Sequence, residues 1–305
     1  MLCLRKQAGH TTGGSACRPG RTVRVVAAAL MLAGLTGCLT RYHPEPGPFN
    51  EGVDQLDQER YADAVASFKR ALELYPDDYR SHFNLGCAYD ALGRTEAAKE
   101  QYEAVLKIQP GNVPARLNLA AQALRAGDRN RAVGLLEEAA GADTDDPRGP
   151  SSRAQLALEE GDLAAAERWL KIALERDPEH ADTLYRLGRL HEQKKEPAAA
   201  AAAYEAAVKS DPEDFASLCR LGALALAGND PVSSVRYLER ATVVRGDFRT
   251  AWLDLSGAYL ALGRLESALL AAWEARDLAE TPEEKARDRE HLRDLYRRLL
   301  ADPGK

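Results

Sequence analysis

The chain has 305 residues, of which 45% are hydrophobic and only 6% aromatic, and its formal net charge is −6. This acidic balance argues against general binding to nucleic acid, because phosphate contacts require a basic surface. The five cysteines include no CxxC pair and no metal-ligand spacing, so we expect neither a metal nor another cofactor.

The first segment, residues 1–37, has the pattern of a secretory signal peptide. Arg21 and Arg24 precede an apolar run of eleven residues that extends from Val25 to Leu35. A membrane-spanning helix needs about 20 residues, so the run is too short to be an anchor in itself. It predicts the apolar core of a signal peptide.

The apolar run ends in Leu35-Thr36-Gly37-Cys38, which resembles a bacterial lipobox. The resemblance implies cleavage before Cys38 and attachment of a diacylglycerol to its sulfur. The alternative is an ordinary signal peptide with a chance cysteine. Residues 1–20 form a polar leader that is unusual before a signal peptide, so we hypothesise that translation starts downstream, near Val23 or Val25.

Cleavage before Cys38 would remove five basic residues and no acidic residue, which changes the net charge from −6 to −11. Residues 38–48 contain three prolines and predict an extended tether between the lipid and the fold. Acyl chains would hold the protein on a bilayer. Leu39 follows the cysteine, which favours the outer membrane facing the periplasm.

From residue 45 to residue 282, small residues recur with a spacing of 34 and no insertion or deletion. The seven frames are 45–78, 79–112, 113–146, 147–180, 181–214, 215–248 and 249–282. In each frame, which we number 1 to 34, positions 8, 20 and 27 carry Gly, Ala or Ser, with Val105 as the exception. The side chain at position 24 is large in the first six frames: Phe68, Tyr102, Leu136, Leu170, Tyr204 and Leu238. In the seventh frame it is Ala272. Small residues allow two antiparallel helices to approach closely, and a bulky one would overpack the contact.

The frame 79–112 carries a further set of spaced residues: His82, Leu85, Gly86, Tyr89, Ala98, Tyr102 and Pro110. This pattern resembles the tetratricopeptide repeat, with His and Tyr in the usual Trp and Phe positions. The resemblance implies an all-α fold, a right-handed superhelix of about seven helix-turn-helix repeats. Glycines at the turn inside four frames fit helix ends: Gly93, Gly127, Gly161 and Gly263.

Two repeats depart from the pattern. Pro48 and Glu51 stand at usually apolar positions, so the first helix of frame 45–78 should be short. In frame 147–180 the run from Pro147 to Ser152 predicts a delayed and shortened first helix. Asp143, Asp145 and Asp146 precede that run; a solvated loop that caps the next helix is favoured over a calcium site, because no EF-hand spacing follows.

The C-terminal segment predicts a capping helix over residues 283–300. Thr281 and Glu284 form a capping box around Pro282. An apolar stripe follows at helical spacing: Leu292, Leu295, Tyr296 and Leu299. Terminal repeats need a polar cover, so we interpret this helix as solvating, with a partner-binding helix as the alternative.

No catalytic pattern is present, and we predict that the chain is not an enzyme. His191-Glu192 lacks the second histidine of a zinc-protease helix, and neither a nucleophile elbow nor a phosphate-binding glycine loop occurs.

The resemblance to tetratricopeptide repeats implies that the first helices line a concave groove. Position 6 carries Asn50, Asn84, Asn118, Ser152, Arg186, Arg220 and Asp254, which resembles the asparagine ladder by which some members of the family hold an extended peptide. Amides can both donate to and accept from a peptide backbone, and the arginines could bind a carboxylate. Position 5 adds apolar surface, including Phe83, Leu117 and Tyr185. The alternative is that these asparagines make local bonds only.

These observations predict a membrane-anchored adaptor or assembly factor of the bacterial envelope that binds an extended segment of a protein partner. Two alternatives stay open: a scaffold for cell-wall enzymes that uses its convex face, and a pilotin-type lipoprotein that assists secretin assembly. The oligomeric state and the partner are not encoded in any motif we find.

Overall fold

The computed structural model describes residues 47–142 and 145–301, and these residues form α-helices joined by short turns, without a β-strand. They divide into two compact bodies at Pro178. The N-terminal body contains α2 (Pro48–Asp57), α3 (Tyr61–Leu74), α4 (Tyr79–Ala91), α5 (Thr95–Ile108), α6 (Val113–Arg125), α7 (Arg129–Ala142), α8 (Arg148–Glu160) and α9 (Leu163–Arg176). The C-terminal body contains α10 (Ala181–Gln193), α11 (Pro197–Ser210), α12 (Phe215–Ala227), α13 (Pro231–Val244), α14 (Arg249–Ala261), α15 (Leu265–Asp277) and α16 (Pro282–Ala301).

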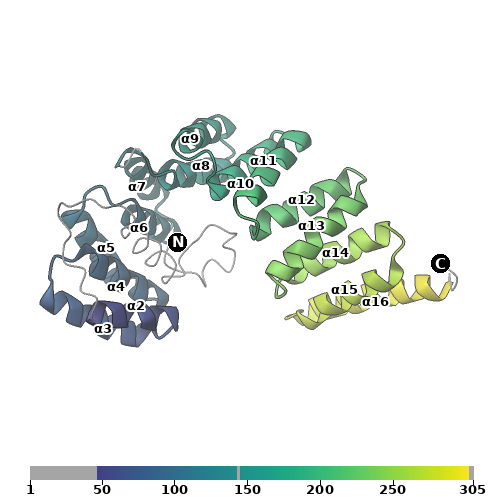
Figure 1. The fold of residues 1–305 in the computed structure, drawn as a ribbon, viewed down its shortest axis with the longest axis horizontal. Helices are drawn as coiled ribbons and strands as arrows, with labels where there is room; N and C mark the ends of the chain where they lie inside the picture. The colour runs from purple at the N-terminus through teal and green to yellow at the C-terminus, as the bar shows by residue number, and fades with distance from the viewer. Residues whose placement is uncertain (1–46, 143–144, 302–305) are drawn as a thin grey trace, which may run out of the picture. The chain divides into compact units, whose positions relative to one another are not determined.

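Within each body, every helix packs against the next helix in the chain, so neighbouring helices form a continuous array (Figure 1). Each of the seven frames contains one pair of helices. The all-α repeat array predicted from the 34-residue spacing is therefore confirmed.

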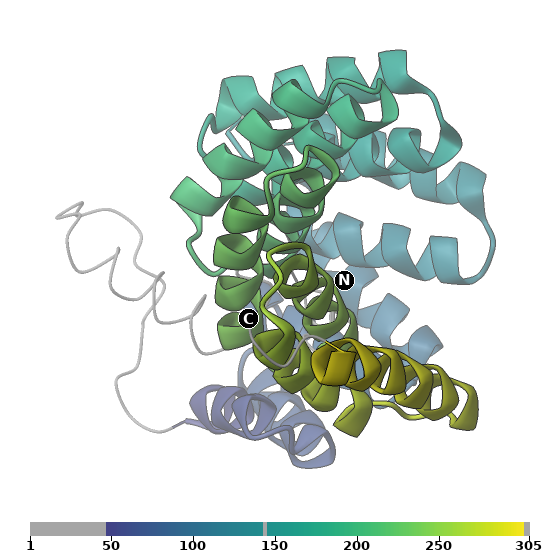
Figure 2. The same cartoon turned by 90° about the vertical axis from the view of Figure 1, so that its right-hand side faces the viewer.

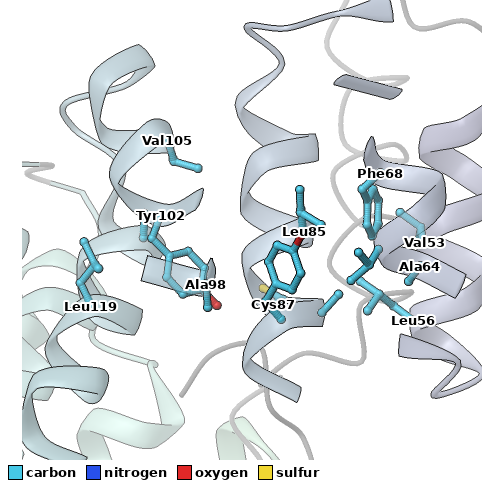
Figure 3. Packing of buried hydrophobic residues seen from close by; sticks show 14 residues of the cluster. Val53, Leu56, Ala64, Phe68, Leu85, Cys87, Ala98, Tyr102, Val105 and Leu119 are labelled. Atoms are coloured by element: carbon cyan, nitrogen blue, oxygen red, sulfur yellow. The ribbon is translucent and has the colours of Figure 1, made fainter. Parts of the chain in front are cut away.

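The glycine at position 8 and the large side chain at position 24 interlock inside a repeat. A Cβ atom added to Gly86 would lie 2.6 Å from Cε1 of Tyr102, and one added to Gly52 would lie 2.7 Å from Cε1 of Phe68. Both rings are fully buried. Figure 3 shows Phe68 among Val53, Leu56 and Ala64. The small residue is therefore required by the ring that packs on its backbone, as interior packing density demands.

The turn between the two helices of a repeat has a left-handed residue at position 15 in all seven frames. Glycine occupies it in four, with φ of 71° at Gly93, 78° at Gly127, 75° at Gly161 and 70° at Gly263. The other three are Glu59 (φ 60°), Lys195 (φ 61°) and Asn229 (φ 60°). The backbone conformation is thus a property of the repeat, and three repeats adopt it at a steric cost.

Two sequence expectations about helix starts are corrected. The helix α8 is not shortened: it spans 13 residues, like α4 and α6, and starts one position later in its frame. Its Pro150 lies in the first turn, where the missing N–H has no intrahelical partner in any case. Gly149 lets the helix approach α7 closely, since a Cβ there would lie 2.6 Å from the carbonyl carbon of Ala139.

The second correction concerns the predicted tether, residues 38–48. Pro48 is the first residue of α2 and therefore does not belong to an extended segment. The helix α2 has 10 residues, which agrees with the expected short first helix. The predicted signal peptide, Cys38 and most of the tether lie outside the described residues.

The predicted helix over residues 283–300 is present as α16, which packs along α15 (Figure 2), while its role as a solvating cap stays a prediction. The amide of Glu284 donates to Oγ1 of Thr281 (3.2 Å), and the amide of Thr281 donates to Oε2 of Glu284 (3.1 Å), which completes the capping box. Leu292 and Leu295 are buried against α15, whereas Tyr296 is exposed.

Candidate peptide-binding face

The predicted ladder residues of the N-terminal body are largely buried. Asn118 is only 2% exposed and Asn84 is 9% exposed, while Asn50 is half-buried near the start of α2. The expectation that Asn84 and Asn118 lie on an open face is wrong. Whether any ladder residue binds a peptide stays a prediction.

A buried polar network explains the position of Asn118. The hydroxyl of Tyr102 donates to Oδ2 of Asp90 (3.2 Å), and Nε2 of Gln122 donates to Oδ1 of the same carboxylate (2.9 Å). Arg125 adds an ion pair to Asp90 at 3.3 Å. Burial raises the pKa of Tyr102 well above its usual value, and the nearby Asp90 carboxylate adds to the shift, whereas a hydrogen bond with Asn118 opposes it. The Asn118 amide is therefore buried close to the Tyr102 hydroxyl.

The apolar residues at position 5 pack on position 24 of their own repeat. The ring of Phe83 lies 5.9 Å from the ring of Tyr102, and the ring of Tyr185 lies 5.6 Å from that of Tyr204, both in tilted arrangements. Leu117 is buried in the core between α6 and α7. Such aromatic pairs stabilise the repeat by about 1 kcal/mol each beyond their buried area. Phe83 and Tyr185 nevertheless keep part of their surface accessible.

The C-terminal body presents its ladder residues differently. The side chain of Arg220 is 48% exposed, and its Nη1 lies 3.8 Å from Oε2 of Glu192, a loose ion pair. Arg186 is half-buried and donates from Nη1 to the backbone oxygen of Asp182 at 2.9 Å. Tyr185 lies close to Arg220 and interacts with it. A guanidinium, a partly open aromatic ring and a carboxylate thus meet on the first helices α10 and α12.

The two acidic residues near the buried tyrosines, Asp90 and Glu192, can be recognised in the sequence, although our prediction did not include them. Position 12 is leucine in five frames and acidic only in two, as Asp90 and Glu192. Those same two frames carry tyrosine at position 24, as Tyr102 and Tyr204. In one repeat the Tyr102 hydroxyl donates to Asp90, and in the other burial, followed by the charge of the nearby Glu192, raises the pKa of Tyr204. A leucine at position 12 accompanies an apolar position 24 elsewhere.

Residues 47–142 and 145–301 bring together no group of three or more side chains that could hold a metal ion. Over the same ranges, no helix combines the length and apolar character that crossing a bilayer requires. Of the predicted acidic loop, Asp146 accepts a bond from the amide of Arg148, the first residue of α8 (2.8 Å), and pairs with its guanidinium, while the N-cap Pro147 makes no side-chain cap bond.

The tetratricopeptide repeat family model matches residues 49–113, 151–215 and 219–282, and a second model of that family matches residues 91–156. The chain belongs to the tetratricopeptide repeat family. Human protein O-mannosyl-transferase TMTC3 is 30% identical over 165 residues, which cover 48% of this chain and 18% of that protein. The BBSome complex member BBS4 of Xenopus tropicalis is 28% identical over 158 residues, covering 48% of this chain and 31% of its own. The chain spans less than a third of the length of either relative.

Among solved structures, Pseudomonas aeruginosa PilF has a TM-score of 0.59 at 19% identity, covering 70% of this chain and 97% of its own. PilW, described as a widely conserved type IV pilus biogenesis factor, has a TM-score of 0.52 at 16% identity, with 64% and 91% coverage. The Cut9–Hcn1 assembly has a TM-score of 0.64 at 12% identity, covering 96% of this chain and 55% of its own. These similarities establish the fold. Tetratricopeptide repeats bind protein or peptide partners, so the chain is a protein-interaction module.

Proposed function

We propose that this tetratricopeptide protein is a lipid-anchored adaptor of the bacterial envelope that binds an extended segment of a partner protein on its first-helix face. The observation that carries the binding proposal is the half-exposed guanidinium of Arg220, held beside Tyr185 and Glu192 on α10 and α12. A partly open ring next to a loosely paired guanidinium suits a peptide with an apolar side chain and a carboxylate.

The structure narrows the proposed contact region. Asn84 and Asn118 are buried, and Asn118 is engaged with Tyr102, so a peptide could reach them only by opening that packing. Arg186 and Arg220 are more accessible and carry a charge that a peptide carboxylate can pair with. We therefore assign the main contacts to Tyr185, Arg186 and Arg220 rather than to the whole ladder.

A detergent-solubilised pull-down with mass spectrometry tests this assignment. The Arg186→Ala, Arg220→Ala double variant should lose its specific partner while its circular dichroism spectrum stays unchanged. The matched control is Lys171→Ala, Lys209→Ala, which also removes two cations but from the exposed surfaces of the second helices α9 and α11. Retention of every partner by the arginine variant would refute the groove proposal.

The lipid anchor and the envelope location rest on the sequence of residues 21–38. Metabolic labelling with a fatty-acid analogue should modify the wild-type protein but not the Cys38→Ser variant, and membrane fractionation should follow the label. An unlabelled wild-type protein in the soluble fraction would contradict this part of the proposal.

A pilotin-type role in secretin or pilus assembly is the alternative that the structural neighbours favour. PilF and PilW share this fold, and PilW is described as a pilus biogenesis factor. Sequence identities of 19% and 16% establish a common fold but not a common function. A secretin or pilus subunit among the proteins lost from the arginine variant would select this alternative. A scaffold that uses the convex face predicts instead that cell-wall enzymes are retained by that variant. We propose no catalytic activity for any of the three.

A further inference from the structure

The last repeat carries two exposed apolar residues at positions that are polar or small in the other repeats. Position 25 is Lys69, Glu103, Glu137, Lys171, Glu205 and Glu239 in frames one to six, and Trp273 in the seventh. Position 22 is Ala, Glu, Gly, Arg, Ala and Arg in the first six frames, and Leu270 in the last. Leu270 is 69% exposed and the ring of Trp273 is also accessible. Repeat chemistry alone does not account for this change.

Contacts elsewhere in the array show what a residue at position 25 faces. Glu239 accepts a hydrogen bond from Tyr259 at position 11 of the next first helix (2.5 Å), and Glu205 accepts one from Tyr237 at position 23 of the next second helix (3.0 Å). Position 25 therefore lies against both helices of the following repeat. Trp273 donates from Nε1 to the hydroxyl of Tyr296 on α16 (3.3 Å), so α16 lies where the first helix of a following repeat would lie. In the described part of the C-terminal body, no helix lies where the second helix of that repeat would pack.

A row of four basic residues runs along the open side of α16. Lys285, Arg289, Arg293 and Arg297 are exposed and follow one another at intervals of four residues, so they share one face of the helix. Within residues 145–301 none of the four pairs with an acidic side chain, and Arg289 donates only to the backbone oxygen of Lys285.

Of the five acidic residues of α16, three pair with arginines, whereas Glu283 and Glu290 are exposed, and Glu290 borders the basic face beside Arg297. Glu284 and Asp288 pair with Arg249 on α14, and Asp294 pairs with Arg298. Tyr296 and Leu300, which is 79% exposed, complete the basic face at the same helical phase.

We propose that Leu270, Trp273, Tyr296 and Leu300, flanked by these four cations, form a docking surface for an acidic amphipathic helix of a partner protein. The helix would lie where the second helix of an eighth repeat would pack. Its apolar side would cover Trp273, Tyr296 and Leu300, and its carboxylates would pair with Arg293 and Arg297. Helix-in-groove recognition with Trp, Tyr and Arg at the centre is a common arrangement in interfaces. This surface is separate from the first-helix face of the proposed function.

Charge argues for this occupant over two others. The chain as a whole is acidic, so the basic strip is a local reversal that selects an acidic partner. A second copy of the chain and an anionic membrane are the competing occupants, and each can be measured separately.

The test uses the full chain and a synthetic helical peptide with leucines at i, i+3 and i+7 and glutamates beside them. The control peptide carries lysine in place of each glutamate. The acidic peptide should bind, with a change in anisotropy of a peptide label, and the lysine peptide should not. The Arg293→Glu, Arg297→Glu variant should bind the acidic peptide at least roughly tenfold more weakly.

The matched control is Arg287→Glu, Arg298→Glu, which reverses two charges on the other side of the same helix and should keep its affinity. Trp273→Glu should also weaken binding without unfolding the repeat, because four other repeats carry glutamate at that position. Equal binding of both peptides, or unchanged affinity in the arginine variant, would overturn the proposal. Selective binding of phosphatidylglycerol vesicles would also overturn it. The same holds if the protein does not bind the acidic peptide but self-associates in sedimentation, and Trp273→Glu abolishes that self-association. The Arg186→Ala, Arg220→Ala variant should bind the acidic peptide normally, which separates this test from that of the first-helix face.

Discussion

The interlock of position 8 with position 24 allows a quantitative test in the first repeat. In the Gly52→Ala variant the new Cβ would lie 2.7, 2.8 and 2.9 Å from three ring carbons of Phe68. The ring is fully buried and packed against its neighbours, so it has no free space into which to move. We place the overpacking cost near the upper end of the usual range, at about 3 kcal/mol. Replacing a helical glycine by alanine returns about 1 kcal/mol, so the net loss of stability should be about 2 kcal/mol.

A second substitution removes the clash without adding a polar group. Phe68→Leu shortens the side chain and gives the residue found at position 24 in three other repeats. Alone it should cost about 1–2 kcal/mol, through lost buried area and the lost edge contact with Phe49. In the Gly52→Ala, Phe68→Leu double variant the alanine should no longer destabilise. The double-mutant cycle should therefore show a coupling energy of about 3 kcal/mol in favour of the native pair, which is the overpacking cost that Phe68→Leu removes.

Urea unfolding followed by circular dichroism gives the four free energies, and hydrogen exchange of residues 48–74 assigns the change to this repeat. Hydrogen exchange must be measured for this repeat separately, because a repeat array can unfold in segments. If Gly52→Ala is neutral, or if its cost is the same in the wild-type and Phe68→Leu backgrounds, then the ring does not select the glycine and the packing argument fails.

Three further predictions follow from the same geometry. Glycine in place of Glu59 or Lys195 should each stabilise the protein by about 1 kcal/mol in urea unfolding, because both residues hold φ near 60°; a lower midpoint would contradict this. Cys219 should resist alkylation by iodoacetamide at pH 8 in the native state and react after unfolding, because burial raises its pKa to about 12; peptide mapping by mass spectrometry measures the modification, and rapid native labelling would refute the prediction. Alanine at Arg249 should cost about 3 kcal/mol and accelerate hydrogen exchange in α16, because the guanidinium pairs with the almost completely buried Asp288 at 2.5 Å; unchanged exchange there would show that the pair does not hold the helix.

The fold was predictable because close helix approach imposes its requirement at every repeat. Three columns of small residues in one register could not arise from composition alone, and the structure places a large side chain against position 8 in several of them. The left-handed turn was only partly predictable. Glycine revealed it at Gly93 and its equivalents, but Glu59 and Lys195 adopt the same φ without a local sequence signal.

The start of α8 shows where local propensity misleads. Two prolines and a glycine within four residues argued for a shortened helix, yet Pro150 lies in the first turn and Gly149 lies against the backbone of α7. The residues that break an isolated helix are the ones that allow this helix to begin against its neighbour. Tertiary packing decided the outcome, and the sequence of one segment does not contain that information.

The position-6 ladder changes from asparagine to arginine along the chain, and Asn118 and Arg220 each follow a repeat with an acidic residue at position 12 but differ in exposure. Where Asp90 pairs with Tyr102 and Gln122, the next asparagine is drawn into the same buried network. Where the preceding acid is Glu192, position 6 is Arg220, whose side chain stays half exposed at 3.8 Å from that carboxylate. The short amide side chain of Asn118 stays buried near the phenol, whereas the guanidinium of Arg220 has further N–H donors that a ligand can use. The ladder therefore identifies equivalent positions of the first helices, and the length of the side chain at each position, with its buried neighbours, decides whether it remains available to a partner.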